Sequence, residues 1–561
     1  MLASLPRSAW WLFAAVLLAA WFSGIGVRRL QHPDEGRYAE IAREMAATGD
    51  WVTPRLNGLK YFEKPPLQYW ATAAVFDAFG AREWTARLVP ALAGLLGVGI
   101  VGWTAARLDG PVTGVYAALT LAASLWHFAR SQVLPLDAVL SFFLGAALCA
   151  FLLAQRDALS RVSQRHWMLL AYAAAAGATL TKGLVGLVIP GGALVLYTAI
   201  TRDTGPWRRL WLLPGLAVFL VLTAPWFVLV SRANPEFAHF FFIHEHVERF
   251  LTTEHHRTGG WYYFVPLLLA GMMPWLLIWI ATLPRSWRDA SVAANGFSWV
   301  KFCLAWALLV FVFFSLSGSK LPSYILPMFP ALALVLGLQL TKVSARMLAA
   351  CTLPLAIISM VAFVLLLVLY DSLVARFSEA STPPAVFAAF GPWMTVAIGI
   401  IAASELAAVV FFRRHSDAGR SLGIVPLALG MTIAVQTGFI GYDAFRATRS
   451  AWDLLQAGAA ANGGPLDPHA PVYQVRTYDQ TIPFYLARET TLVSYRDEMA
   501  LGLESEPDKG IASEDQWIKT WAALPQGYAM MRPEDFDEMT IRSVPMRVLA
   551  RDQRRVLVAR R

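Results

Sequence analysis

Long apolar stretches follow one another along the chain as far as about residue 443. A hydrocarbon core about 30 Å thick needs roughly 20 mainly apolar residues for each membrane-spanning helix. The pattern predicts about thirteen spans, at residues 9–27, 84–106, 111–128, 134–154, 167–181, 183–200, 210–231, 262–283, 299–317, 323–340, 348–370, 390–412 and 421–443. Lys182 and Gly183 interrupt residues 167–200, which two short helices or one broken helix would explain equally well.

The distribution of Lys and Arg between the loops predicts the orientation. Loops on the side of the N-terminus contain most of these residues, whereas the opposite short loops contain only Arg130, Lys182, Lys320 and Arg376. Cytoplasmic loops are enriched in Lys and Arg, so we expect a cytoplasmic N-terminus. An odd number of spans then places three segments outside: residues 28–83, residues 232–261 and the terminal segment 444–561.

The terminal segment has a different pattern from the rest of the chain. Short strand-like runs alternate with helical runs such as 513–523, and the strand-like runs lie at 471–475, 490–494, 528–531, 546–549 and 555–559. This alternation predicts an α/β domain. We therefore expect a transmembrane domain at 1–443 and a second domain at 444–561, in which no chemical motif is evident.

Composition supports the membrane interpretation and argues against two other classes. The chain of 561 residues is 57% hydrophobic and 15% charged, whereas soluble domains are roughly 45–50% apolar with about 25% charge. The terminal segment has 15 Lys and Arg against 16 Asp and Glu, so the net charge of +9 belongs to the membrane part. Membrane lipids are therefore expected partners and nucleic acid is not. The three cysteines all lie in predicted spans, which favours neither disulfides nor redox chemistry.

The first exterior segment carries a dense charged motif at its start. Tyr38, Ile41 and Met45 recur at helical spacing, so residues 34–45 are expected to form an amphipathic helix at the membrane surface. Asp34 and Glu35 begin this helix. They could serve as a helix cap and acidic first turn, or they could act on a substrate.

The same segment continues with Tyr61, Glu63 and Lys64 before Pro65-Pro66. An interfacial aromatic belt with a lysine at the lipid headgroups would explain this pattern. The alternative is a lysine held beside a lipid phosphate.

The second exterior segment is rich in imidazole and carboxylate groups, including His244, Glu245 and Arg249. A divalent metal could bind here, with Glu63 and His244 as candidate ligands, although no metal-binding spacing such as HExxH is present. The segment could equally be a solvated polar loop, or His244 could form a hydrogen bond to a substrate.

Further ionisable groups lie at the ends of predicted spans. They are expected to face a cavity or a partner, because charge at membrane depth is costly. By the predicted topology they converge near one face of the membrane. We therefore predict Asp34 and Asp137 as catalytic residues, and as substrate-binding residues Glu35, Tyr38, Tyr61, Glu63, Lys64, Lys182, His244, Arg249, Lys320 and Tyr324.

Four blocks of sequence resemble one enzyme family. They are residues 32–38 (HPDEGRY), 61–67 (YFEKPPL), 180–183 (LTKG) and 319–327 (SKLPSYILP). Together they are similar to the aminoarabinose transferases that modify lipid A, which are GT-C enzymes related to protein O-mannosyltransferases.

The resemblance implies transfer of 4-amino-4-deoxy-L-arabinose from undecaprenyl phosphate to a lipid A phosphate. This reaction would occur on the periplasmic side of the bacterial inner membrane and confer polymyxin resistance. The acidic residue of the family's first periplasmic loop falls on Asp34, and its carrier-phosphate lysine falls on Lys64. Because a phosphate acceptor is largely ionised, we expect Asp34 to orient it or to stabilise positive charge rather than to remove a proton.

Three alternative functions are possible. One differs from this prediction in the acceptor, and two belong to another class of protein. The closest is a protein O-mannosyltransferase or another envelope glycosyltransferase that uses a polyprenyl-phosphate sugar. A secondary transporter would also need many spans, but we find no convincing internal repeat. A scaffold protein would leave the charges that cluster on the outer face without a role.

Overall fold

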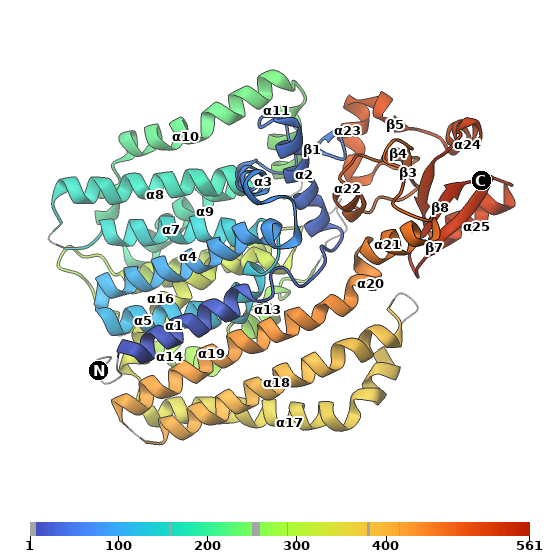
Figure 1. Cartoon of the computed structure of the whole chain (residues 1–561). Coiled ribbons are helices and arrows are strands. Elements are labelled where there is room, and N and C mark those ends of the chain that lie inside the picture. The colour runs from blue at the N-terminus through green and yellow to red at the C-terminus, as the bar shows by residue number, and fades with distance from the viewer. Residues whose placement is uncertain (1–6, 158, 249–258, 289, 378–381, 415) are drawn as a thin grey trace.

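The computed structural model describes residues 7–157, 159–248, 259–288, 290–377, 382–414 and 416–561. A bundle of mainly apolar helices lies beside a smaller domain built on a β-sheet (Figure 1). The bundle helices are α1 (Arg7–Phe22), α4 (Glu83–Asp109), α5 (Pro111–Ala123), α6 (Leu125–Ser131), α7 (Asp137–Ala154), α8 (Arg161–Lys182), α9 (Val185–Thr201), α10 (Leu212–Ala233), α13 (Phe264–Gly271), α14 (Leu276–Arg288), α15 (Trp299–Leu316), α16 (Phe329–Lys342), α17 (Ala345–Phe377), α18 (Pro384–Phe412) and α19 (Asp417–Gly441).

Length and composition identify this bundle as the membrane-spanning part of a multi-pass protein. Within the described residues, 8 helices are long and apolar enough to cross a membrane, or up to 10 if each of two bent pairs is one span. Each predicted span overlaps one of the bundle helices or a bent pair of them. The total of about thirteen spans stays a prediction, because the remaining helices fall short of the length or hydropathy that a full crossing needs.

Two predicted spans differ in shape from a straight helix. Helices α5 and α6 meet at 65° within the span predicted at 111–128, and α13 and α14 meet at 103° within the one at 262–283. Pro274 lies in the second break and cannot donate a backbone hydrogen bond. In the interrupted region 167–200, two separate helices are the correct alternative: α8 ends at Lys182, and Gly183 adopts a φ of 83° that favours glycine.

The first exterior segment contains α2 (Asp34–Thr48), strands β1 (Arg55–Leu56) and β2 (Leu59–Lys60), and α3 (Leu67–Phe79). The predicted helix therefore forms, and it ends at Gly49 with φ 70°. Its position at a membrane surface stays a prediction, but its charged face is not exposed: Glu40 and Glu44 are as buried as Ile41 on the apolar face. The reason is that α3 and the terminal domain pack against it.

The terminal segment forms the predicted α/β structure. Its helices and strands are α20 (Arg446–Arg449), α21 (Trp452–Ala461), β3 (Val472–Val475), α22 (Thr481–Leu486), β4 (Thr491–Val493), α23 (Ala500–Ser505), β5 (Gly510–Ile511), α24 (Glu514–Ala523), β6 (Tyr528–Met531), α25 (Pro533–Ile541), β7 (Met546–Arg551) and β8 (Val556–Arg560). The sheet order is β5-β4-β3-β6-β8-β7. Alternate residues such as Val472 and Tyr473 enter different buried clusters, as expected for a sheet covered on both faces.

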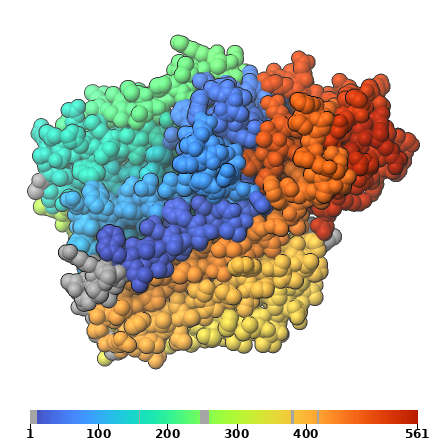
Figure 2. All heavy atoms as spheres, viewed as in Figure 1, coloured from blue at the N-terminus to red at the C-terminus, as the bar shows by residue number. Residues whose placement is uncertain are grey.

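The terminal domain packs closely on the first exterior segment (Figure 2). Tyr38 and Ile41 of α2 share one buried cluster with Phe484 and Leu492 of the domain. Gly36 comes so near that a Cβ there would lie 2.8 Å from the backbone of Gln480. The boundary between 443 and 444 stays a prediction, but the two parts share a core.

The second exterior segment completes this end of the molecule. It contains α11 (Phe237–His239) and a π-helical stretch, Phe240–Glu248. Lys60 of the first segment pairs with Glu236 at 2.7 Å, and Phe62 packs edge-on against Phe237 at 5.3 Å between ring centroids. The three segments predicted to be exterior therefore meet at one end of the bundle.

Candidate active site

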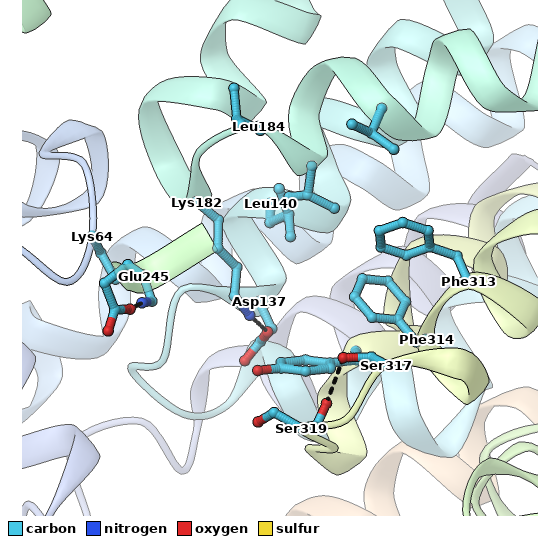
Figure 3. Close-up of a pocket in the computed structure, with 13 residues that line it drawn as sticks. Lys64, Asp137, Leu140, Lys182, Leu184, Glu245, Phe313, Phe314, Ser317 and Ser319 are labelled. Carbon is cyan, nitrogen blue, oxygen red and sulfur yellow. Dashed lines mark hydrogen bonds and ion pairs between the residues drawn. The ribbon is translucent and has the colours of Figure 1, made fainter. Parts of the chain in front are cut away.

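A cavity of about 300 Å³ lies between the start of α7, the junction of α8 and α9, and the end of α15 (Figure 3). We call it the membrane-side cavity. Leu184 and Val188 on its wall are 41% and 43% exposed on the outside of the bundle, so its apolar end opens where lipid would lie. It is lined by Lys64, Asp137, Leu140, Lys182, Leu184, Val185, Val188, Glu245, Phe313, Phe314, Ser317, Ser319 and Tyr324.

Asp137 is held between two cations in this cavity. Lys182 Nζ donates to Asp137 Oδ1 at 2.5 Å, and Arg130 Nη2 donates to Oδ2 at 3.1 Å. The Tyr324 ring centroid lies 4.8 Å from Lys182 Nζ. Because two positive charges share one carboxylate, this side of the cavity has cationic character suited to an anion.

Lys64 provides a second cation to the membrane-side cavity. Its Nζ donates to the Glu63 carbonyl oxygen at 2.6 Å and to Glu245 Oε2 at 2.9 Å. Pro65 and Pro66 follow Lys64 directly and precede α3. The restricted φ of these two prolines fixes the backbone next to this lysine. The ion pair with Glu245 joins the first and second exterior segments.

A second cavity of about 390 Å³ adjoins the first, because Glu245 lines both. We call it the outer cavity. Its wall is mostly polar and contains more carboxylates than cations, and the terminal domain supplies half of its residues. The outer cavity is lined by Pro33, Arg37, Glu63, Phe240, His244, Glu245, Gln480, Tyr495, Asp497, Glu498, Ala500 and Leu501.

Asp34 lies at the edge of this pair of cavities, as the first residue of α2. Its Oδ1 accepts a hydrogen bond from Arg37 Nη1 at 3.0 Å, and its side chain is 52% exposed. Asp34 does not cap the helix, because Pro33 occupies the N-cap position and no side chain caps it, but the acidic first turn is confirmed, since Asp34 and Glu35 begin α2. Asp34 is therefore an accessible carboxylate beside the outer cavity.

Three of the candidate carboxylates lie around Tyr38. Burial raises the pKa of the Tyr38 hydroxyl, and the charges of Asp34, Glu63 and Asp137 raise it further, so all three lie within electrostatic reach. The Tyr38 ring stacks on Tyr69 with 6.0 Å between centroids. Burial raises the pKa of Tyr61 as well, and its buried hydroxyl has no hydrogen-bond partner among the described residues. These tyrosines stay neutral, and neither lines one of the two cavities.

Five of the predicted site residues that the structure describes line neither cavity, namely Asp34, Tyr38, Tyr61, Glu35 and Lys320, and the last two are held by other partners. Glu35 forms a bidentate pair with Arg87, with both contacts at 2.8 Å. Burial opposes ionisation, but Arg87 prevails and lowers the pKa of Glu35 to about 2. Lys320 is buried and donates to the Ser317 carbonyl oxygen at 2.5 Å. Neither position supports the predicted contact with substrate, and Arg249 lies outside the described residues.

The candidate metal ligands Glu63 and His244 do line one cavity. In the described part of the chain, however, no group of three or more His, Cys, Asp or Glu side chains is arranged to hold a metal ion. Glu245, the nearest addition, is paired with Lys64. Protein zinc sites use three or four ligands, so the described residues alone complete no metal site; the metal stays a prediction, and no chemical step is assigned to one.

The sequence interpretation missed the terminal domain's share of the site. Gln480, Tyr495, Asp497 and Glu498 line the outer cavity, and Arg37 pairs with Glu498 across the domain contact. No local motif marks these residues, because they meet the first exterior segment only through the fold.

Comparison with known families gives two matches along the chain. Residues 9–241 match the model for dolichyl-phosphate-mannose-protein mannosyltransferase, and residues 461–560 match the aminoarabinose transferase C-terminal domain. The first match includes Lys64, Asp137 and Lys182, and the second covers most of the terminal domain.

Curated relatives carry the name undecaprenyl phosphate-alpha-4-amino-4-deoxy-L-arabinose arabinosyl transferase. The protein of Edwardsiella ictaluri is 32% identical over 333 residues, which is 59% of each chain. That of Erwinia tasmaniensis is 34% identical over 314 residues, or 55% of each chain. The matched region thus spans less than two thirds of the length of these relatives.

Solved structures extend the likeness to the whole chain. The structure of ArnT from Cupriavidus metallidurans bound to undecaprenyl phosphate is 37% identical, covers 99% of this chain and 98% of that one, and has a TM-score of 0.91. An oligosaccharyltransferase of Archaeoglobus fulgidus, 13% identical with a TM-score of 0.50, shares the fold alone. Since the likeness to ArnT spans nearly all of both chains, this protein belongs to the undecaprenyl phosphate-aminoarabinose arabinosyl transferase family of the GT-C superfamily.

Proposed function

We propose that this protein transfers 4-amino-4-deoxy-L-arabinose from undecaprenyl phosphate to a phosphate of lipid A on the periplasmic face of the bacterial inner membrane. One observation carries the proposal: the membrane-side cavity joins a lipid-facing apolar wall to Lys64 and Lys182. A polyprenyl phosphate has this same combination of an apolar tail and an anionic head. The names of the relatives supply the sugar.

The carrier phosphate would lie between Lys64 and Lys182, with the prenyl chain along Leu184 and Val188. Charge-assisted hydrogen bonds from two ammonium groups are among the stronger polar contacts in proteins. Glu245 now holds Lys64, so the phosphate would replace or share that carboxylate as its partner.

Transfer breaks the bond between the sugar C1 and the carrier phosphate oxygen and forms a bond from C1 to an acceptor phosphate oxygen. Undecaprenyl phosphate leaves with the electron pair, and the two lysines stabilise its charge. A phosphate monoester is largely ionised near neutral pH, with a second pKa of about 6, so a strong base is unnecessary. The accessible carboxylate of Asp34 instead orients the acceptor or stabilises positive charge at C1.

The amino sugar itself would point into the outer cavity. Its ammonium group suits a wall that contains Glu63, Asp497 and Glu498. Asp137 is less suited, because Lys182 and Arg130 already occupy both of its oxygens.

The match of residues 9–241 to mannosyltransferases supports a second candidate, a protein O-mannosyltransferase. Purified protein supplied with labelled undecaprenyl phosphate-aminoarabinose should label lipid A and leave a serine-rich peptide unlabelled. Labelling of the peptide, or use of a mannosyl donor in preference to the aminoarabinose donor, would favour the second candidate.

A further inference from the structure

The order of strands in the terminal domain creates a topological switch point. Strands β3, β4, β5 and β6 are parallel, and β4 and β5 extend the sheet on one side of β3 while β6 lies on the other. In open α/β sheets, ligands bind outside the carboxyl ends of the strands where the order reverses in this way. That point lies between β3 and β6.

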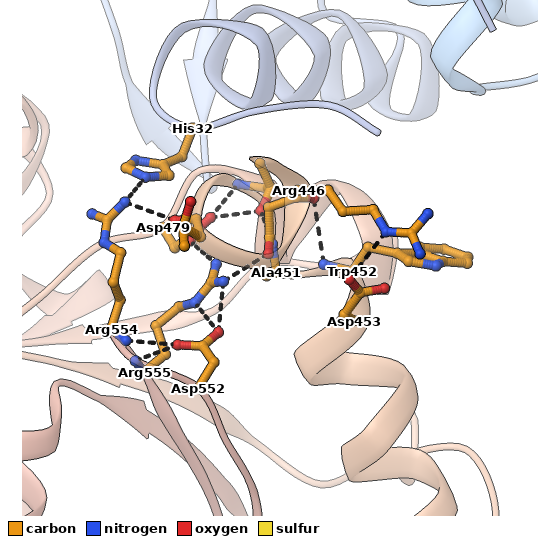
Figure 4. A network of polar contacts seen from close by, with 12 residues as sticks. His32, Arg446, Ala451, Trp452, Asp453, Asp479, Asp552, Arg554 and Arg555 are labelled. Atoms are coloured by element: carbon orange, nitrogen blue, oxygen red, sulfur yellow. Dashed lines mark hydrogen bonds and ion pairs between the residues drawn. The ribbon is translucent and has the colours of Figure 1, made fainter. Parts of the chain in front are cut away.

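A cavity of about 250 Å³ opens at this point. Residues 477–479 follow β3, residues 532–534 follow β6, and the β7–β8 turn adds residues 553–555. His32 of the first exterior segment closes one side of it (Figure 4). We call it the switch-point cavity; nothing in the proposed transfer reaction uses it.

The cations of this cavity differ in how far their charge is neutralised. Arg555 pairs with Asp479 at 2.6 Å and with Asp552 at 2.7 Å. Arg532 pairs with Asp535 at 2.7 Å and with Glu534 at 3.3 Å. Arg554, by contrast, has no carboxylate partner among the residues that the structure describes.

The contacts of Arg554 are to neutral groups. Its Nη1 donates to the Thr448 carbonyl oxygen at 3.0 Å and also to His32 Nε2 (Figure 4). Burial lowers the pKa of His32 to about 4, so this imidazole is neutral near pH 7 and accepts from the guanidinium. Arg554 therefore provides a positive charge at the switch point that no direct ion pair neutralises, although Asp479 and Asp552 act on it from a distance.

We propose that the switch-point cavity binds a phosphate group of a phosphorylated saccharide, the headgroup of the acceptor glycolipid. Arg554 donates to the phosphate, and the exposed polar side chains of Gln553 and Glu534 accept or donate to sugar hydroxyls. The identity of the headgroup rests on the proposed function, whereas the anion site itself rests on the strand order and on Arg554.

The position of the cavity relative to the transfer site supports this role. His32 lines the switch-point cavity, and the next residue, Pro33, lines the outer cavity. Asp34 follows. A headgroup held at Arg554 can therefore present a second phosphate toward Asp34, which gives the terminal domain a part in choosing the acceptor.

Binding of D-glucosamine 1-phosphate to the full-length protein in detergent tests the site without any transfer reaction. Arg554→Ala should weaken this binding about tenfold or more, since a hydrogen bond to a charged group contributes about 1.5–3 kcal/mol. Arg554→Lys should retain most of the affinity. Arg547→Ala, which removes an exposed arginine of β7 outside the cavity, should change nothing.

Lys64→Ala distinguishes this site from the transfer site. Binding of glucosamine 1-phosphate should survive Lys64→Ala. If the Lys64→Ala variant loses this binding while the Arg554→Ala variant retains it, the proposal is overturned. Inorganic phosphate that binds as tightly as glucosamine 1-phosphate would overturn the saccharide assignment. In the transfer assay, Arg554→Ala should raise KM for lipid A and leave KM for the donor unchanged. Failure of transfer with every acceptor would contradict the proposed function alone, because the binding measurement would still report on Arg554.

Discussion

The membrane-side cavity and the outer cavity share Glu245 but are otherwise lined by opposite chemistries. The first joins Lys64 and Lys182 to an apolar wall at the surface of the bundle. The second is polar and rich in carboxylates, and the terminal domain supplies half of its wall. A donor with an anionic phosphate at one end of its headgroup and an ammonium group at the other matches this polarity in only one direction.

The difference assigns separate tasks to the two regions. Contacts in the membrane-side cavity should determine affinity for the carrier and the departure of its phosphate. Contacts in the outer cavity should determine which sugar is accepted. Asp34 lies at the edge of the outer cavity, where the acceptor must approach C1, so its removal should affect the rate more than either affinity.

Lys64→Ala is expected to have the largest effect. Loss of one group that stabilises the leaving phosphate should reduce kcat/KM for transfer about 10²–10³-fold, and affinity for undecaprenyl phosphate should fall as well. Lys60→Ala is a matched control, because Lys60 lies in the same segment but pairs with Glu236 outside both cavities. Equal loss in both variants would mean that charge in this segment matters only for folding.

Asp34→Asn should have the next largest effect. Turnover should fall about 10²-fold, the lower end expected for loss of a group that acts in the transition state. Binding of undecaprenyl phosphate should be unchanged. Glu35→Gln, one residue later, should show the opposite pattern. It breaks the buried pair with Arg87 and should lower thermal stability, since removal of one partner of such a pair costs about 3–5 kcal/mol. If Asp34→Asn also abolishes carrier binding, Asp34 is a ligand for the donor and the division of tasks fails.

Glu63→Gln should have a smaller and more selective effect. The parent protein should prefer the amino sugar to a deaminated donor, and the variant should lose about tenfold of that preference, in line with about 1.5–3 kcal/mol for a charge-assisted hydrogen bond. Transfer from the two donors should be compared by kcat/KM, with Glu236→Gln as the control from the second exterior segment. Unchanged discrimination would remove Glu63 from this role.

The sequence predicted the membrane-side cavity better than the outer one, for a physical reason. Asp137 and Lys182 stand at the ends of predicted spans, where a charge is costly unless it has a function or a partner, and Lys64 lies in an exterior segment on the same side. Their convergence follows once the spans are located. The membrane helices and the strands of the terminal domain were predictable for the same reason, since hydrophobic periodicity reports burial directly.

The outer cavity depends on contacts that periodicity does not encode. Asp497 and Glu498 lie in an ordinary polar stretch and approach Glu63 only because the terminal domain packs on α2. The same packing buried the polar face of α2, which the sequence pattern had assigned to solvent. The ion pair of Glu35 with Arg87 was not predicted, because the two residues lie 52 positions apart in the sequence.

The smallest predicted effect concerns the contact that creates the outer cavity. Glu44 is buried in α2, where its Oε2 accepts from the Gly58 backbone at 2.9 Å, and its carboxyl also hydrogen-bonds with the Glu40 carboxyl, which requires a proton between them. Burial and the nearby Glu40 raise the pKa of Glu44 well above its usual value, despite Arg43. Burial raises the pKa of Glu40 as well, against Arg43, with a smaller contribution from Glu489, and the Tyr478 hydroxyl lies close to both glutamates.

The sign of the pH dependence follows from that raised pKa. Above about pH 4.5 the unfolded chain loses this proton while the folded protein keeps it, so stability falls as pH rises through the folded pKa. Glu44→Gln keeps the acceptor for Gly58 and cannot ionise. Its Tm should therefore equal that of the parent near pH 5 and exceed it by a few degrees near pH 8, with the exposed Glu504→Gln as control. If the two cavities act independently, raising the pH from 5 to 8 should weaken sugar discrimination in the parent protein and leave its affinity for the carrier unchanged. A parallel loss of both would show that α2 supports the two cavities as one unit.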